Sequence, residues 1–334
     1  MRRGTRRRTG TARGSEADIA TAWWSWARPL GGAAILGAVT VQLGTDAFAD
    51  AVRAVDGVAL AGGTVVAAVA TAAGAWRWRV VARQLGVELD LSSALAACYR
   101  AQFLNATLPG GVLGDVHRGV RHGRAVDDVG GGLRGVVWER TCGQLVLVAL
   151  TVVALLAGGP FGSLPLGVGA VAVALLAVLL LGVARLARRR RPGALTRMSQ
   201  VAAADARGLL APSAALSIIG ASIVALAAHV ATFAIAARTV GVRMPVSDFV
   251  PLTLLVLLVA AVPLNLAGWG PREGAAAWAF GAAGASSSQG LAVAVAYGVI
   301  VVVATLPGAV LLLVGRSRGA SATPVGPREV VVHD

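Results

Sequence analysis

The chain has 334 residues, of which 56% are hydrophobic and only 14% are charged, and its mean hydropathy is +0.73. This composition excludes an ordinary soluble domain and indicates an integral membrane protein. All basic residues apart from histidine are arginine, and the formal net charge is +14. A basic chain can bind nucleic acid, but these arginines flank apolar segments and no aromatic RNA-binding motif accompanies them, so we expect no nucleic-acid partner.

The N-terminal segment, residues 1–28, is predicted to be a basic cytoplasmic tail. Six arginines within residues 1–13 precede the first acid, Glu16, and Trp23, Trp24 and Trp26 follow. A secretory signal would place a short apolar core and a small-residue cleavage site there. The sequence has instead the aromatic belt that is typical of a membrane interface. We therefore expect a retained first span.

Apolar segments near the roughly 20 residues that cross a bilayer occur six times. They predict membrane-spanning helices over residues 30–44, 57–75, 132–157, 164–187, 208–237 and 288–315. Two further apolar segments, 92–114 and 249–282, are interrupted by glycine, proline and charged residues. We expect residues 29–318 to form one transmembrane domain and the short polar tail, 319–334, to be disordered.

The arginines also orient the segments, because cytoplasmic loops carry an excess of basic residues. Arginine clusters that we expect to be cytoplasmic flank segment 92–114, with Arg77, Arg79 and Arg83 before it and Arg118, Arg121, Arg124 and Arg134 after it. The segment should therefore enter and leave from the cytoplasm as a re-entrant hairpin. For both termini to be cytoplasmic, segment 249–282 should re-enter from the outside. We predict an all-α, multi-pass protein of the cell membrane, with about six transmembrane helices plus two re-entrant helical hairpins in an inverted repeat. Eight full spans with kinked helices are the alternative.

Two similar polar motifs lie inside these interrupted segments, at residues 103–118 and 263–274. Each places an asparagine after a leucine, then helix-breaking glycine and proline, then an acid and an arginine. Free backbone groups and charges at membrane depth are unfavourable unless protein or trapped water satisfies them. We interpret the two motifs as halves of a polar site near the middle of the membrane.

The candidate substrate-binding residues come from these motifs and from the span between them. They are Asn105, Gly110, Gly111, Gly114, Asp115, Arg118, Glu139, Arg140, Asn265, Gly268, Gly270, Arg272 and Glu273. On a helix, Asp115 and Arg118 share a face and can pair, and a helix that starts after the glycines offers N–H groups to a phosphate. The alternative is a helix cap at Asp115 with arginines that only set topology.

The second motif places Arg272 and Glu273 after Pro271, and a proline at this place predicts that a helix starts there. We expect Arg272 to contact a headgroup or to neutralise an acid on the other hairpin, and Asp115 or Glu139 is the better candidate for a paired acid. A structural ion pair that holds the hairpin shut is the alternative. The motif asparagines are as well suited to satisfying freed backbone groups as to contacting a ligand. His229, alone in an apolar stretch, is expected to be packed or hydrogen-bonded in the core.

Three ordered motifs resemble a known family. The run from Tyr99 to Arg118, the pair Glu139-Arg140 and the run from Ala267 to Gly274 resemble the transmembrane domain of lysylphosphatidylglycerol synthases and the stand-alone flippase-like proteins related to it. The chain departs from the family pattern at Leu113 and Ala267, where the family has glycine, and at Glu139, where it has aspartate.

The resemblance implies lipid handling rather than lipid synthesis, because no segment resembles the soluble aminoacyltransferase domain of the bifunctional members. It implies a lipid flippase-like protein that translocates or binds a phospholipid or lipid-linked precursor. The alternative is a non-transporting subunit that binds lipid and scaffolds a lipid aminoacyltransferase or glycosyltransferase; a third is a membrane transferase acting on lipid-linked sugars. The sequence shows no nucleophile–base pair, metal cluster or phosphate loop, so we expect no enzyme activity, cofactor or metal.

Overall fold

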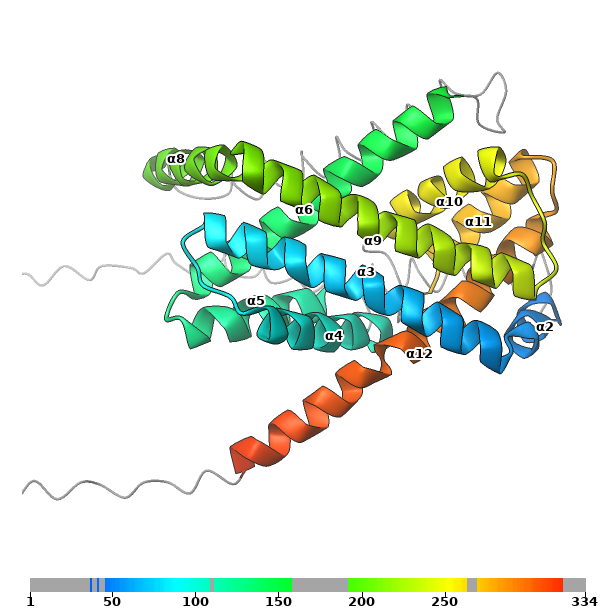
Figure 1. The fold of residues 1–334 in the computed structure, drawn as a ribbon, viewed down its shortest axis with the longest axis horizontal. Helices are drawn as coiled ribbons and strands as arrows, with labels where there is room; N and C mark the ends of the chain where they lie inside the picture. Colours follow the sequence, from blue (N-terminus) through cyan, green and yellow to red (C-terminus); the bar gives the residue numbers. More distant parts are fainter. Residues whose placement is uncertain are drawn as a thin grey trace, which may run out of the picture.

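The computed structural model describes residues 37, 41, 46–108, 111–157, 192–262 and 269–320, and these residues contain helices and no strand (Figure 1). The helices are α2 (Asp46–Ala54), α3 (Gly57–Gln84), α4 (Leu91–Thr107), α5 (Leu113–Ala125), α6 (Val129–Leu156), α8 (Pro192–Leu209), α9 (Pro212–Thr239), α10 (Val246–Ala260), α11 (Pro271–Ala282) and α12 (Ser287–Ala320). Over this part of the chain, the predicted all-α class is confirmed.

Within the described residues, four helices are long and apolar enough to cross a membrane: α3, α6, α9 and the Ser287–Val314 part of α12. They coincide with four of the six predicted spans, and α3 continues beyond the predicted end at residue 75 to Gln84. The predicted spans 30–44 and 164–187 lie outside the described residues, apart from residues 37 and 41. The two interrupted segments fold as pairs of shorter helices, α4 with α5 and α10 with α11.

Aspartates fix the starts of three helices by accepting hydrogen bonds from backbone N–H groups that have no partner inside the helix. Asp56 accepts from Ala59 at the start of α3, and Asp128 accepts from Gly131 at the start of α6. Asp90 accepts from Ser92 and Ser93 at the start of α4. The chain therefore changes direction at defined residues between its long apolar helices.

The helices follow one order twice: a long helix, two short helices and another long helix, as α3–α6 and as α9–α12. The contacts are reciprocal, because α3 packs along α9, α4 packs on α12, and α10 packs on α6. Figure 1 shows that corresponding helices run in opposite directions. The α4/α5 pair has its free ends where α3 ends, at the left of the view, and the α10/α11 pair has its free ends at the right.

The first helical pair is closely packed because Gly114 has no side chain. A Cβ atom at this position would lie 2.0 Å from the backbone carbonyl oxygen of Ala101, which is too close for any side chain. Only glycine therefore allows α5 to pack this closely against α4. The contact places the start of α5, which carries Asp115, beside the second half of α4.

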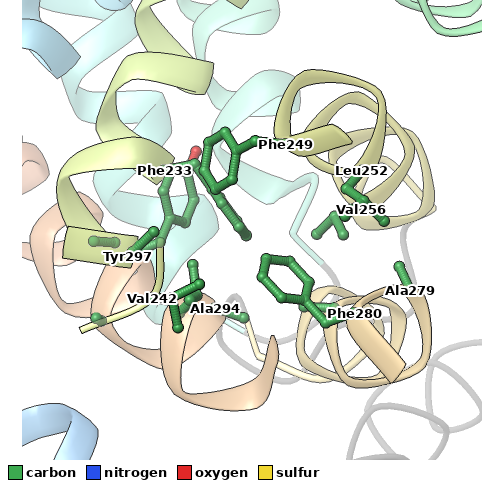
Figure 2. Packing of buried hydrophobic residues seen from close by; sticks show 14 of the residues in the cluster. Phe233, Val242, Phe249, Leu252, Val256, Ala279, Phe280, Ala294 and Tyr297 are labelled. Carbon is green, nitrogen blue, oxygen red and sulfur yellow. The ribbon is translucent and has the colours of Figure 1, made fainter. Parts of the chain in front are cut away.

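The second pair is held by the largest apolar core, which α9, α10, α11 and α12 build together (Figure 2). The ring of Phe233 lies 5.0 Å from that of Tyr297 and 6.2 Å from that of Phe249, measured between centroids. Phe280 of α11 completes the cluster and is fully buried. In a membrane, such close packing between helices supplies stability that the hydrophobic effect does not.

Candidate functional site

A buried ion-pair network joins α3, α5 and α6. Glu139 accepts from two arginines: Oε1 receives Arg77 Nε at 3.0 Å and Nη2 at 2.5 Å, and Oε2 receives Arg118 Nη2 at 2.5 Å. Asp115 also accepts from two arginines, with Oδ1 3.0 Å from Arg118 Nε and Oδ2 2.6 Å from Arg140 Nη2. The five side chains therefore form one chain in which three arginines alternate with two acids.

Exposure differs sharply along this network. The side chains of Glu139 and Arg118 are each 4% exposed, that of Asp115 is 12% exposed, and that of Arg77 is 13% exposed. The side chain of Arg140 is 52% exposed. A charge buried in protein needs a partner and further hydrogen bonds, and the four inner members have them. Arg140 is the open end of the network.

The α4/α5 turn places Asp115 at this point. Asn105, near the end of α4, accepts a hydrogen bond from the backbone N–H of Gly114 at 2.8 Å and donates from Nδ2 to Asp115 Oδ2 at 3.1 Å. Asn105 thus satisfies one of the free N–H groups at the start of α5, which is one of the two roles that its position beside the helix break allowed. The predicted pairing of Asp115 with Arg118 is confirmed.

Arg118 is further fixed by an aromatic and a sulfur contact. Its guanidinium lies 4.7 Å from the ring centroid of Trp78, a cation–π geometry, and its Nη1 lies 3.5 Å from Cys98 Sγ. Arg118 is therefore held from α3, α4 and α6, and it is not the interface charge that the alternative interpretation described.

A pocket of about 380 Å³ opens onto Asp115 and Arg140. Its described lining is otherwise apolar or uncharged and comes from α5 with the turn before it, from α6, and from the end of α10: Gly111, Val112, Val116, Leu133, Val136, Val137, Thr141, Gln144, Ala260, Ala261 and Val262. Both predicted hairpins thus contribute to one pocket. Arg272 is not among its described lining residues.

The second motif forms a closed arrangement at the start of α11. Pro271 is the first helical residue, as predicted, and Glu273 Oε2 accepts from the backbone N–H of Gly270 at 2.7 Å. Glu273 Oε1 accepts from Arg272 Nε at 2.9 Å and Nη2 at 2.5 Å. Glu273 is fully buried.

The expectation that Asp115 or Glu139 neutralises Arg272 is wrong, because Arg272 pairs with its sequence neighbour, Glu273. The physical reason is the helix cap: a glutamate at the third position folds back over the helix start. Its carboxylate then lies within reach of the guanidinium of Arg272, although adjacent residues on a helix ordinarily point apart.

Arg272 is enclosed by α12. Its guanidinium lies 5.2 Å from the ring centroid of Tyr297 and 5.3 Å from that of Trp269. A Cβ atom on Gly298 would lie 2.4 Å from Arg272 Nη2, so the guanidinium occupies the space that a side chain would take. The hydroxyl of Tyr297 lies 3.0 Å from His229 Nδ1, which confirms the expectation of a hydrogen-bonded core histidine.

Three candidate residues, Gly110, Asn265 and Gly268, lie outside the described residues. Two contributors were missed: Arg77, and Ser222 of α9, whose Oγ accepts from Arg77 Nη1 at 3.0 Å. The sequence interpretation grouped Arg77 with other arginines as cytoplasmic charges. The position of Arg77 between two tryptophans inside a long apolar helix could have distinguished it from the arginines at cytoplasmic ends.

No group of His, Cys, Asp and Glu side chains suited to a metal ion occurs within the parts of the chain that the structure covers. The described site consists of arginines and carboxylates around a small pocket. Guanidinium groups in general bind anions through charge-assisted hydrogen bonds.

The chain matches the family described as "Lysylphosphatidylglycerol synthase TM region" over residues 25–308. This range includes all the motifs that carry the resemblance, both helical pairs and most of α12. No curated protein matches the chain.

Proposed function

We propose, from the premise that the chain belongs to the lysylphosphatidylglycerol synthase TM-region family, that this multi-pass integral membrane protein is a lipid flippase-like protein. The protein binds the anionic headgroup of a phospholipid or lipid-linked precursor and moves this lipid between leaflets. No chemical reaction is part of the proposal. The observation that carries the proposal is the half-exposed guanidinium of Arg140, which lines the pocket while paired to Asp115.

A phosphate can replace Asp115 on Arg140 without leaving that acid stranded. Asp115 keeps two other partners, Arg118 and Asn105, when Arg140 turns to a ligand. A guanidinium binds phosphate oxygens in the same forked geometry as a carboxylate. The pair of Asp115 and Arg140 thus acts as an exchangeable contact, which transport requires because the ligand must also leave.

The pocket suits a headgroup better than a whole lipid. Its volume of about 380 Å³ lies at the lower end of ligand pockets, which span roughly 300–1,000 Å³. Acyl chains would remain in the bilayer while the headgroup enters between α5, α6 and the end of α10. The uncharged lining beside Arg140 would exclude a second charge.

We include in the proposal that the helices form an inverted repeat, with the α4/α5 and α10/α11 pairs re-entering from opposite sides and both termini in the cytoplasm. The repeated helix order, the reciprocal contacts and the opposite running directions support it (Figure 1). Inverted repeats with broken helices place substrate sites where the two halves meet. The pocket has that position, because both pairs contribute to its lining.

The test is leaflet exchange in vesicles reconstituted with the purified protein and fluorescent phosphatidylglycerol. Arg140→Gln should lower the exchange rate about tenfold or more, as expected for the loss of one charge-assisted contact, while the thermal midpoint changes little. Arg207→Gln, which removes an exposed charge from α8, is the matched control and should exchange lipid like the wild type.

Two results would contradict the proposal. If the Arg140→Gln protein exchanged lipid at the wild-type rate, Arg140 would not belong to the site. Lipid binding by the wild type without any exchange, tested also with a lipid-linked precursor, would favour the lipid-binding scaffold instead.

A further inference from the structure

Three basic side chains of the α4/α5 pair stand apart from the buried network: Arg100 on α4, and His117 and Arg121 on α5. None of them takes part in an ion pair within the described residues. Arg100 Nε and His117 Nδ1 are buried atoms without a hydrogen-bond partner there. A buried polar atom without a partner is unfavourable, and native proteins contain few of them.

The three side chains lie at one level of the helical pair, because Ala101, next to Arg100, meets Gly114, and Cys98 contacts Arg118, next to His117. His117 and Arg121 are four residues apart and share a face of α5. Arg100 and Arg121 carry like charges, and an anion bound between them would offset their repulsion.

This cluster is distinct from the pocket at Arg140. Neighbouring residues on a helix point about 100° apart, and Arg118, which follows His117, faces the buried network. None of the three basic residues is among the described lining of the pocket. Arg121 is exposed, so an anion can reach the cluster from outside the network.

We propose that Arg100, His117 and Arg121 form a second anion site that binds a phosphate group on the face of the α4/α5 pair turned away from Asp115. Two guanidinium groups from different helices match the several oxygens of a phosphate. His117 would add a polar contact when its side chain turns to expose Nδ1, which is covered in this structure. The bound phosphate would tie α4 to α5 and so set the spacing of the pair that carries Asp115. The inference goes beyond the transport proposal, because it does not involve Arg140.

The phosphate can come from an anionic lipid headgroup or from solution, and the experiment distinguishes these sources. The full chain, purified in neutral detergent, is titrated with short-chain phosphatidylglycerol and separately with inorganic phosphate, and binding is followed by native mass spectrometry and by the thermal midpoint. Arg140→Gln is included in every protein so that the pocket does not contribute.

In that background, Arg121→Gln should weaken binding of the anion about tenfold, as for one charge-assisted contact. Arg121→Lys, which keeps the charge, should recover part of it. The matched control is Arg83→Gln, which removes an exposed charge at the end of α3 and should bind like its parent. Binding of phosphatidylglycerol that inorganic phosphate does not displace identifies a headgroup site; displacement by phosphate identifies a site for the free anion.

Three results would overturn the proposal. One is that neither probe binds the Arg140→Gln protein. The second is that Arg121→Gln binds as its parent does. The third is an equal loss in Arg121→Gln and Arg83→Gln, because this would show only general attraction of an anion to a basic surface, which salt screens.

Discussion

The α4/α5 and α10/α11 pairs are built alike but use their charges differently. In each pair the second helix has an acid as its third residue, Asp115 in α5 and Glu273 in α11. Asp115 shares its oxygens with side chains from α4, α5 and α6. The hydrogen bonds of Glu273 go to its immediate neighbours at the start of α11.

The long helices that follow the pairs show the same contrast. Counted from the start of each helix, Tyr297 and Gly298 of α12 occupy the positions that Glu139 and Arg140 occupy in α6. In the first half these positions supply charges to the network, whereas in the second half they supply an aromatic ring and empty space that receive Arg272.

We propose that this difference separates a site that exchanges partners from one that holds the fold. A network shared by several helices keeps other contacts when it loses one, so a ligand could enter it. Within the described residues, Arg272 pairs with no acid other than Glu273. On this proposal the first pair recognises the ligand, and Arg272 and Glu273 have the structural role that the sequence left open as an alternative.

The largest effect is expected for Glu139→Gln. The change leaves Arg77 without an acid and leaves the buried Arg118 with Asp115 alone. Breaking a buried ion pair from one side costs about 3–5 kcal/mol. The thermal midpoint of the purified protein should fall strongly and its yield from membranes should drop. Adding Arg118→Gln should not restore stability, because Arg77 would still lack its acid.

Glu88→Gln is the matched control for this change. Glu88 is exposed between α3 and α4, so removing its charge should leave the midpoint unchanged. A Glu139→Gln protein as stable as this control would show that the network does not hold α3, α5 and α6 together.

An effect of the same order, but recoverable, is expected in the second pair. Arg272→Gln and Glu273→Gln should each lower stability by about 3–5 kcal/mol, because each change breaks the buried ion pair from one side. The double variant should recover much of this loss, because both charges of the closed pair are gone and the glutamine at 273 still accepts from Gly270.

The same variants decide the role of Arg272 when lipid exchange is measured. Recovery of both stability and exchange in the double variant would establish the structural role. A double variant that is stable but inactive would contradict it and return Arg272 to the substrate site.

The helices and the motif geometry were predictable from the sequence because they depend on local rules. Proline at the first position of α11, the break after Leu108, and the pairing of residues three apart in α5 all follow from helix geometry. The family was recognisable for the same reason, since its motifs mark these breaks. Four long apolar helices were likewise visible as uninterrupted apolar segments.

The partners of the arginines were not predictable, because they depend on how distant helices pack. Arg77 joins Glu139 only when α3 lies against α6, and the rule that arginines mark cytoplasmic ends concealed this contact. Arg272 pairs with Glu273 because the side chain folds back over the helix start, against the general rule that adjacent helical residues point apart. Both errors arise where tertiary contacts override a local rule.

The smallest structural change tests whether the first pair opens to water, as a re-entrant pair with a polar pocket should. Val116 of α5 lines the pocket and is 49% exposed, whereas Leu145 of α6 is 46% exposed but is not among its described lining residues. Cysteines replacing these two residues, in a protein whose Cys98 and Cys142 are changed to alanine or serine, should differ in labelling by a small water-soluble thiol reagent. The cysteine at position 116 should react, because contact with water favours the reactive thiolate. The cysteine at position 145 should not react, because it faces lipid. A cysteine at Ala277, buried in α11, should also stay unlabelled.

Labelling at position 116 from the cytoplasmic side alone would support the predicted direction of entry. Equal protection of the cysteines at positions 116 and 145 would favour continuous spans instead.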